Sequence, residues 1–258
     1  MESPHSFVGR QIAVTGGCSG IGLAVTKTLL ALGGTVYVAD LTSQAPNGLT
    51  NHKTCHITLN CDVTNRQSCK SFLDSIPNRL DGLVNSAGTA SWEGRIGTDA
   101  IFHRTMQINV TGSWNMATEA LLRMQGQEDI EGSGIVSGSI RSVGKGSVVN
   151  VGSGASVRGI AGLTVYTASK HAVLGLTRAW VRDFPRMRVN LVAPVPGATE
   201  TPLAEATLSG TPKGDPSVDV GEAQIGSIPK GRMAYATDIA DAIVFFLSDG
   251  SSFITGQC

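Results

Sequence analysis

The chain has 258 residues, 41% of them hydrophobic, and a formal net charge of zero. A balanced charge argues against nucleic acid or a membrane surface as a partner, and no apolar run reaches the ~20 residues of a membrane span. The five cysteines form no CxxC pair, and no histidine lies at metal-ligand spacing. Residues 1–10 lack the apolar core of a signal peptide. We therefore expect a cytoplasmic protein with reduced thiols, no metal and a single domain over residues 1–258.

The pattern over residues 11–33 predicts a buried strand, a glycine turn and an amphipathic helix that ends at Gly33-Gly34. The first N–H groups of such a helix lack intrahelical partners, and glycines let a pyrophosphate approach the backbone. A second apolar run, 35–39, ends in Asp40, where an acid would bind a ribose 2′-OH. This order predicts a dinucleotide site made by Gly16, Ser19, Gly20, Ile21, Gly22 and Asp40.

Strands and helices alternate along the rest of the chain. Further strands are predicted at 56–61, 81–84, 147–151 and 189–193, and helices at about 65–79, 98–123, 165–183 and 236–248. Cys55 and Cys61 are expected on one face of the third strand, and Thr64 could cap the next helix. Residues 124–146 have no clear period and are expected to be a surface insertion. The alternation predicts an α/β fold of Rossmann type: a doubly wound, mainly parallel seven-stranded sheet with helices on both faces.

Four polar residues fall where such a sheet binds its ligands, beyond the carboxyl ends of its strands. Tyr166 and Lys170 are four residues apart and so share one face of a predicted helix. Ser153 follows the preceding strand, and Asn109 lies within the long helix. Taken separately, each has a more ordinary explanation. Tyr166 and Lys170 could be an exposed helix pair, Ser153 a strand-end hydroxyl, and Asn109 a cap or a solvated amide. Their joint placement is what favours a catalytic site.

With the glycine turn, these residues resemble the short-chain dehydrogenase/reductase family over nearly the whole chain. The motifs that carry the resemblance are Thr15-Gly16-x-x-x-Gly20-Ile21-Gly22, Asp62-Val63, Asn85-Ser86-Ala87-Gly88, Asn109, Ser153, Tyr166-x-x-x-Lys170, Arg188-Val189-Asn190, Pro196-Gly197-Ala198-Thr199-Glu200-Thr201-Pro202 and Ile254-Thr255-Gly256-Gln257. The resemblance implies an oxidoreductase in which Tyr166 is the general acid/base and Lys170 binds the nicotinamide ribose. Ser153 would orient the substrate oxygen, and Asn109 would help hold a proton-relaying water.

The resemblance also implies further cofactor contacts. Asp62, Val63, Asn85, Ala87 and Gly88 would line the adenosine side. Gly197, Thr199 and Thr201 would lie about the carboxamide and pyrophosphate.

A free phenol has a pKa of about 10, too high for a base at neutral pH. An ammonium about 4 Å away contributes only ~1 kcal/mol in bulk water, under one pKa unit. At an effective dielectric constant near 20 the same charge gives about 4 kcal/mol, roughly three units. The acid/base role that the resemblance implies for Tyr166 therefore requires a partly dehydrated site, in which the Lys170 ammonium lowers the pKa of the phenol.

The cofactor expected is NAD(H). Asp40 accepts a hydrogen bond from a ribose 2′-OH but repels a 2′-phosphate. Members of the family that use the phosphorylated cofactor often have cations at the positions of Ser19 and Leu41, and neither residue is charged. Three features depart from the family pattern. Pro194-Val195 stands where Pro-Gly is usual, the 124–146 segment is longer, and the chain stops at Cys258 within its last strand.

The substrate pocket is expected between residues 154–165 and the loop region 194–230, with Ser91-Trp92 near its mouth. These segments carry no cluster of Arg or Lys, which favours a neutral, fairly apolar ketone or secondary alcohol, such as a polyketide, terpenoid or steroid-like molecule. The resemblance implies a homodimer or homotetramer that packs through the 98–123 and 165–183 helices. Two other hypotheses stay open: a dinucleotide-binding sensor or scaffold without turnover, and a cyclase or isomerase on the same fold.

Overall fold

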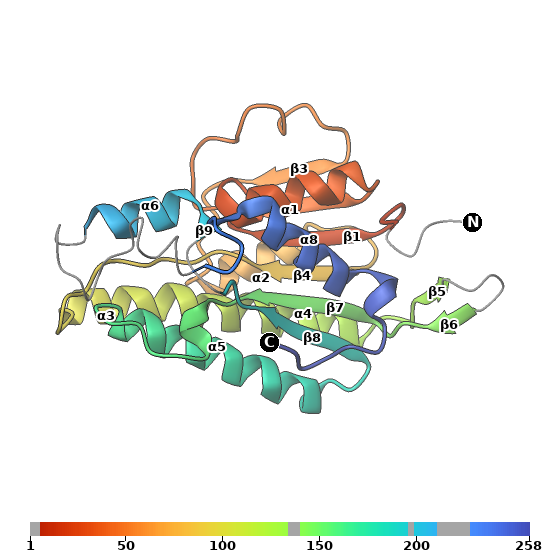
Figure 1. Cartoon of the computed structure of the whole chain (residues 1–258). Helices are drawn as coiled ribbons and strands as arrows, with labels where there is room; N and C mark the ends of the chain where they lie inside the picture. Colours follow the sequence, from red (N-terminus) through yellow and green to blue (C-terminus); the bar gives the residue numbers. More distant parts are fainter. Residues whose placement is uncertain (1–5, 134–139, 196–198, 211–227) are drawn as a thin grey trace.

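A computed structural model describes residues 6–133, 140–195, 199–210 and 228–258 (Figure 1). Over these ranges the main sheet has six strands, all parallel. In order across the sheet they are β3 (Cys55–Thr58), β2 (Thr35–Ala39), β1 (Gln11–Thr15), β4 (Gly82–Asn85), β7 (Gly146–Val151) and β8 (Met187–Val192). The chain order reverses between β1 and β4, which is the switch point where doubly wound sheets bind ligands. The predicted fold class is confirmed.

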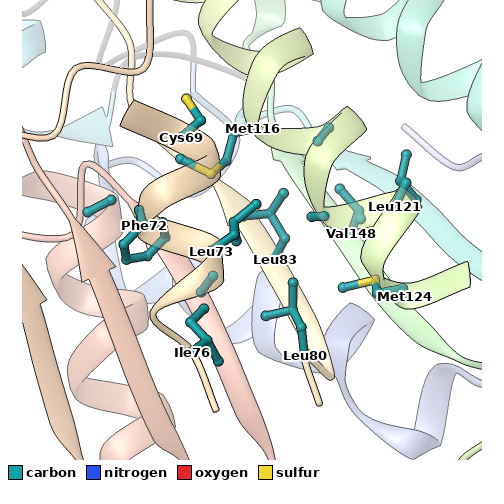
Figure 2. Packing of buried hydrophobic residues seen from close by; sticks show 14 of the residues in the cluster. Cys69, Phe72, Leu73, Ile76, Leu80, Leu83, Met116, Leu121, Met124 and Val148 are labelled. Carbon is teal, nitrogen blue, oxygen red and sulfur yellow. The ribbon is translucent and has the colours of Figure 1, made fainter. Parts of the chain in front are cut away.

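Helices cover both faces of the sheet. They are α1 (Gly20–Ala31), α2 (Arg66–Asp74), α3 (Asp99–Met106), α4 (Ser113–Gln125), α5 (Thr164–Asp183), α6 (Pro202–Ser209) and α8 (Ala236–Leu247). In β1, Ile12 and Val14 pack with α1 and α8, whereas Ala13 packs on the opposite face with α2, α4 and α5. Figure 2 shows part of this second cluster, where Phe72 and Leu73 of α2 and Met116 of α4 meet Leu83 of β4. Strands buried on both faces explain the continuous apolar runs in the sequence.

The sheet has one strand fewer than predicted, because residues 254–257 lie beside β8 without forming a strand. Two backbone hydrogen bonds join them to β8: the Leu191 N–H donates to the Gln257 carbonyl (2.9 Å) and the Gly256 N–H to the Val189 carbonyl (2.8 Å). Side chains make the further hydrogen bonds between this segment and β8. The Thr255 hydroxyl accepts from the Val189 N–H (3.0 Å), and Asn190 contacts both Ile254 and Gln257.

Two local predictions around β3 are wrong. The strand ends at Thr58, and Asn60 has a φ of +55°, so the chain turns before Cys61. Cys61 consequently packs on the α2 face, whereas Cys55 packs against the α1 face. The cap of α2 is Asn65, whose side-chain oxygen accepts from the Ser68 N–H (3.1 Å).

The remaining segments refine the prediction. The long helix expected at 98–123 consists of α3, a π-helical segment at Gln107–Gly112 and α4. The expected insertion carries the antiparallel pair β5 (Glu131–Ser133) and β6 (Ile140–Ser142), and in Figure 1 this pair lies at the opposite end of the molecule from α6. In the region after β8, β9 (Thr199–Glu200), which precedes α6, pairs in parallel with β10 (Ala234–Tyr235), which precedes α8. Within the described ranges, no helix combines the length and apolar composition needed to cross a membrane.

Candidate cofactor and catalytic site

The glycine turn after β1 is packed too tightly for side chains. Gly16 has a φ of +64°, and a Cβ there would come within 2.9 Å of the Ala87 Cα. A Cβ on Gly22 would lie 2.2 Å from the Gly16 carbonyl oxygen. Ser19 is the N-cap residue of α1 and is extended, but its side chain makes no capping hydrogen bond. The helix therefore begins directly after the turn, as the pattern over residues 11–33 predicts, and its first N–H groups have no partner within the helix.

Thr201 is distant in sequence but lies beside this turn. Its side chain is 3.4 Å from the point that a Gly20 Cβ would occupy. Thr199 is buried in β9 close by in sequence. Gly197 lies outside the described residues. Val195, at the departure from the family pattern, packs over Gly154, whose N–H donates to the Pro194 carbonyl (3.1 Å). The Pro194-Val195 pair thus sits against the loop that carries Ser153.

Asp40 ends β2 beside the turn. Its Oδ2 accepts from the Cys18 N–H (2.9 Å), and its Oδ1 accepts from the Thr42 N–H (3.0 Å). Each carboxylate oxygen keeps a further lone pair, so both can still accept from ribose hydroxyls. Burial, and then the Asp40 charge, raise the pKa of the Cys18 thiol to about 12, which makes it a poor nucleophile.

The adenosine-side residues divide into two kinds. Asp62 is partly exposed and accepts from the Thr64 N–H (2.9 Å), and Val63 is buried. Asn85, by contrast, is buried, and its Nδ2 donates to the Asn150 Oδ1 (2.9 Å) and the Ser113 carbonyl (3.3 Å). Its side chain therefore joins β4 to β7 and to the start of α4 in the interior and is not directed at a ligand.

Thr15 is a residue whose role the sequence reasoning missed. Its hydroxyl oxygen accepts from the N–H groups of both Ser86 and Ala87, each at 3.1 Å. The ends of β1 and β4 are thereby held together across the switch point, which sets the distance between the glycine turn and Gly88. In the sequence, the available signal for this role of Thr15 was the Thr15-Gly16 pair that begins the turn motif.

Tyr166 and Lys170 lie on one face of α5, and the Lys170 Nζ is 5.7 Å from the centre of the Tyr166 ring. The Lys170 ammonium is buried and donates to the Val151 carbonyl (2.8 Å). Burial lowers its pKa to about 8, because removing water disfavours the charged form. Ser153 faces the phenol, and its own oxygen accepts from the Ala155 N–H (3.2 Å).

The pKa of Tyr166 departs from the expectation. Burial raises it above the ordinary value, and the hydrogen bond with Ser153 offsets this only in part. The Lys170 ammonium donates to the Val151 carbonyl, and burial of the phenol sets the direction in which its pKa moves. The sequence analysis predicted a partly dehydrated site with a lowered phenol pKa, whereas burial raises the pKa of Tyr166 in the chain without its ligands.

Asn109 lies in the π-helical segment and is almost fully buried. Its Oδ1 accepts from the Thr89 N–H (2.8 Å), and its Nδ2 donates to the Thr89 carbonyl (2.9 Å) and the Ser169 hydroxyl (3.0 Å). Because both amide protons are used, Asn109 can offer a relay water only an oxygen. A Cβ on Gly88 would lie 3.3 Å from the Asn109 Oδ1 and 3.9 Å from the Lys170 Nζ, so Gly88 separates the two side chains.

Glu93 is a second residue that the sequence did not reveal. It is 7% exposed, and its two carboxylate oxygens accept from the N–H groups of Val165 (2.6 Å) and Tyr166 (2.9 Å). Its partners lie more than 70 residues further along the chain, beyond the reach of any local pattern. The indole of Trp92, next to it, rests on Gly162.

A glycine turn that opens a helix at the switch point of a doubly wound sheet, with a Tyr, Lys and Ser gathered at the same edge, defines an oxidoreductase of the dinucleotide-binding class. A family model described as enoyl-(acyl carrier protein) reductase matches residues 16–258. The chain belongs to the short-chain dehydrogenase/reductase family, whose members bind a nicotinamide dinucleotide.

Several characterised proteins are similar over nearly their whole length. The chain is 32% identical to a 2,5-dichloro-2,5-cyclohexadiene-1,4-diol dehydrogenase of Sphingobium indicum, over 97% of this chain and 94% of that protein. It is 31% identical to 2-(S)-hydroxypropyl-CoM dehydrogenase 3 of Xanthobacter autotrophicus, over 95% and 92% respectively.

Solved structures agree with this. Levodione reductase superposes with a TM-score of 0.81 at 27% identity, covering 97% of this chain and 95% of that one. A putative NAD(P)-dependent gluconate 5-dehydrogenase from Beutenbergia cavernae, solved with bound NADP at low occupancy, superposes with a TM-score of 0.83 at 24% identity, over 99% and 96%. The fold is therefore shared with both, and the relatives named here are dehydrogenases or reductases.

Proposed function

We propose that this protein is a NAD(H)-dependent oxidoreductase that interconverts a secondary alcohol and a ketone on a small molecule. The observation that carries the proposal is the placement of Tyr166, Ser153 and Lys170 at the edge of the sheet that also holds the glycine turn. NAD, when bound, supplies or accepts the hydride. The rest of the reaction is a proton transfer at the substrate oxygen, which the chain's own residues perform.

Tyr166 is the proposed general acid/base. Its raised pKa keeps the phenol protonated at neutral pH, so it can give its proton to the oxygen of a ketone. The hydroxyl of Ser153 holds the same oxygen by a hydrogen bond. Lys170 holds the nicotinamide ribose through its ammonium, and Asn109 holds a water on the path by which Tyr166 regains its proton.

The residues present fit the cofactor. Gly16 and Gly22 let the turn fold tightly against Ala87 and itself, so that the start of α1 offers its first N–H groups to a pyrophosphate. Asp40 favours a free ribose 2′-OH over a 2′-phosphate, and the adjacent Leu41 is an exposed apolar side chain in place of a cation. The remaining proposed contacts are Ser19, Ile21, Asp62, Val63, Asn85, Ala87, Gly88, Gly197, Thr199 and Thr201. The structural neighbour with bound NADP is only 24% identical, so its ligand concerns that protein's own cofactor. It does not alter the argument that Asp40 favours NAD(H) here.

The substrate class follows from the rim of the site. Val157 and Val195, beside the Ser153 loop, are 54% and 51% exposed, which favours a neutral, fairly apolar substrate. The Arg158 side chain also lies there, with its Nε 3.5 Å from the point of a Gly154 Cβ. A hydroxy acid or keto acid is therefore the competing class, to be tested in the same screen.

We also propose a homodimer or homotetramer that packs through residues 98–123 and 165–183. Phe102, Trp114 and Leu122 support this, because they are large apolar side chains exposed on α3 and α4. Light scattering on the purified protein tests the oligomeric state.

The experiment for the catalytic proposal is Tyr166→Phe. NADH binding, followed by fluorescence, is expected to survive, while hydride transfer to a panel of ketones falls by orders of magnitude. The wild type is screened with NAD and NADP in parallel. Binding without turnover on any alcohol or ketone would favour a sensor or scaffold, and product formation without net cofactor oxidation would favour a cyclase or isomerase.

A further inference from the structure

The helix that carries Tyr166 and Lys170 begins without a cap of its own. Leu163 is its N-cap residue and has no side-chain acceptor. An N-cap side chain normally accepts from the N–H groups at the second or third helical position. In α5 those positions are Val165 and Tyr166, and both N–H groups donate to Glu93. The cap is therefore supplied by the segment between β4 and α3.

That segment is held to the start of α5 by further contacts. The Glu93 N–H donates to the Gly162 carbonyl (2.9 Å). Gly162 has a φ of +72°, and a Cβ on it would come within 2.0 Å of the Trp92 ring, so only glycine lets the indole approach this closely. Trp92 and Glu93 thus bind the same turn from two successive positions.

The backbone carbonyl of Tyr166 is also connected, through hydrogen bonds, to the segment between β4 and α3. It accepts from the Ser169 hydroxyl (2.7 Å), which in turn accepts from the Asn109 Nδ2 (3.0 Å). Asn109 is paired in both directions with the backbone of Thr89. Both main-chain polar groups of Tyr166 are therefore tied to residues 89–93, which directly follow Gly88.

From this geometry we propose that Glu93 is a positioning residue for the reaction: it couples residues 89–93 to the first turn of α5 and so fixes the Tyr166 phenol against Ser153. The inference rests on the proposed function, in which that phenol transfers the proton. A buried carboxylate is costly unless it is fully hydrogen-bonded, and a Ser or Asp at position 163 would cap α5 locally. A local cap would satisfy the same N–H groups without joining the two segments, whereas a carboxylate from residue 93 adds a direct link between residues 89–93 and the backbone of Tyr166.

The test compares Glu93→Ala and Glu93→Gln with Asn65→Ala. Asn65 caps α2, which carries none of the proposed site residues, so its loss controls for the general effect of removing a cap. A misplacement of about 1 Å costs up to ~100-fold in rate, so we expect kcat of Glu93→Ala to fall 10- to 100-fold. The Kd for NADH should stay within about threefold, since no cofactor contact is removed. Glu93→Gln keeps one acceptor oxygen, so its kcat should lie between those of the wild type and Glu93→Ala. Asn65→Ala should keep the wild-type kcat.

All rates are measured at a temperature at which circular dichroism shows each variant fully folded. If Glu93→Ala does not fold, Glu93→Gln carries the same comparison. A kcat within twofold of wild type in the folded Glu93 variant, or an equal loss in Asn65→Ala, would overturn the proposal.

Hydrogen exchange gives a readout that does not depend on turnover. If Glu93 couples the two segments, amides in residues 89–93 and 164–167 both exchange faster in the Glu93 variants. Faster exchange confined to 164–167 would reduce Glu93 to a simple helix cap and contradict the coupling. Should the wild type transfer no hydride at all, the proposed function fails, while the exchange experiment still decides whether the coupling exists.

Discussion

Replacement of Lys170 by Met tests how much burial of its ammonium costs the folded protein. The pKa of Lys170 is lowered from 10.5 to about 8 by burial alone. A group with a lowered basic pKa binds its proton more weakly in the folded than in the unfolded state. The cost is therefore fully present below about pH 8 and is relieved as pH rises toward 10.5, so this group's contribution makes stability increase with pH over that window.

The size of the effect follows from the same shift. A difference of about 2.5 units corresponds to about 3 kcal/mol, of which about 2 kcal/mol is regained between pH 7 and pH 9.5. Lys170→Met has a side chain of similar length and cannot titrate. Urea unfolding of both proteins at pH 7, 8, 9 and 9.5 gives the difference in unfolding free energy at each pH. We expect the wild type to gain about 2 kcal/mol relative to the variant across this range.

The variant also leaves the Val151 carbonyl without its donor, a loss of about 1–3 kcal/mol that is independent of pH. The slope with pH, rather than the absolute difference, is therefore the quantity that tests the reasoning. Parallel curves for the two proteins between pH 7 and 9.5 would show that the ammonium is not desolvated. NADH binding should weaken in the variant over the whole range, because the proposed ribose contact is lost.

Two further predictions concern the cofactor and the sheet edge. Asp40→Ala combined with Leu41→Arg should bring the Kd for NADPH to or below that for NADH; equal wild-type binding of the two cofactors would contradict the charge argument. Arg188→Met should destabilise the fold by roughly 2–4 kcal/mol in urea unfolding, because the buried guanidinium donates to the carbonyls of Phe246, Leu247 and Ser251, and Met can make none of these hydrogen bonds. Its control is Arg186→Met at an exposed ion pair, expected to change stability by under about 1 kcal/mol.

The parts of the site that sequence predicts are those set by local geometry. The glycine turn, α1 and Asp40 occupy consecutive elements of one strand–helix–strand unit, whose periodicity can be counted directly. Tyr166 and Lys170 share a face because four residues make about one helical turn. These features need no knowledge of the rest of the fold, and the structure places them as expected.

The parts that sequence does not predict depend on contacts between distant segments. Glu93 has no local signature, since its meaning comes from the start of a helix more than 70 residues away. Asn85 belongs to a motif, yet its side chain points into the interior because Asn150 and Ser113 are there to accept from it. At the sheet edge, the family motif at residues 254–257 implied a last strand. The Thr255 hydroxyl and the Asn190 amide make part of the hydrogen bonds between this segment and β8, a detail that the motif does not carry.

Burial shifts the two central groups of the site in opposite directions, and this bears on the direction of the reaction. The pKa of Tyr166 is raised and that of Lys170 is lowered, so each neutral form is favoured. On raising the pH the ammonium loses its proton before the phenol does, and the chain alone does not generate a phenolate beside an ammonium. Donation of a proton to a ketone therefore uses the form of Tyr166 that the chain already stabilises. Oxidation of an alcohol requires the opposite form, the phenolate, which the burial of Tyr166 disfavours.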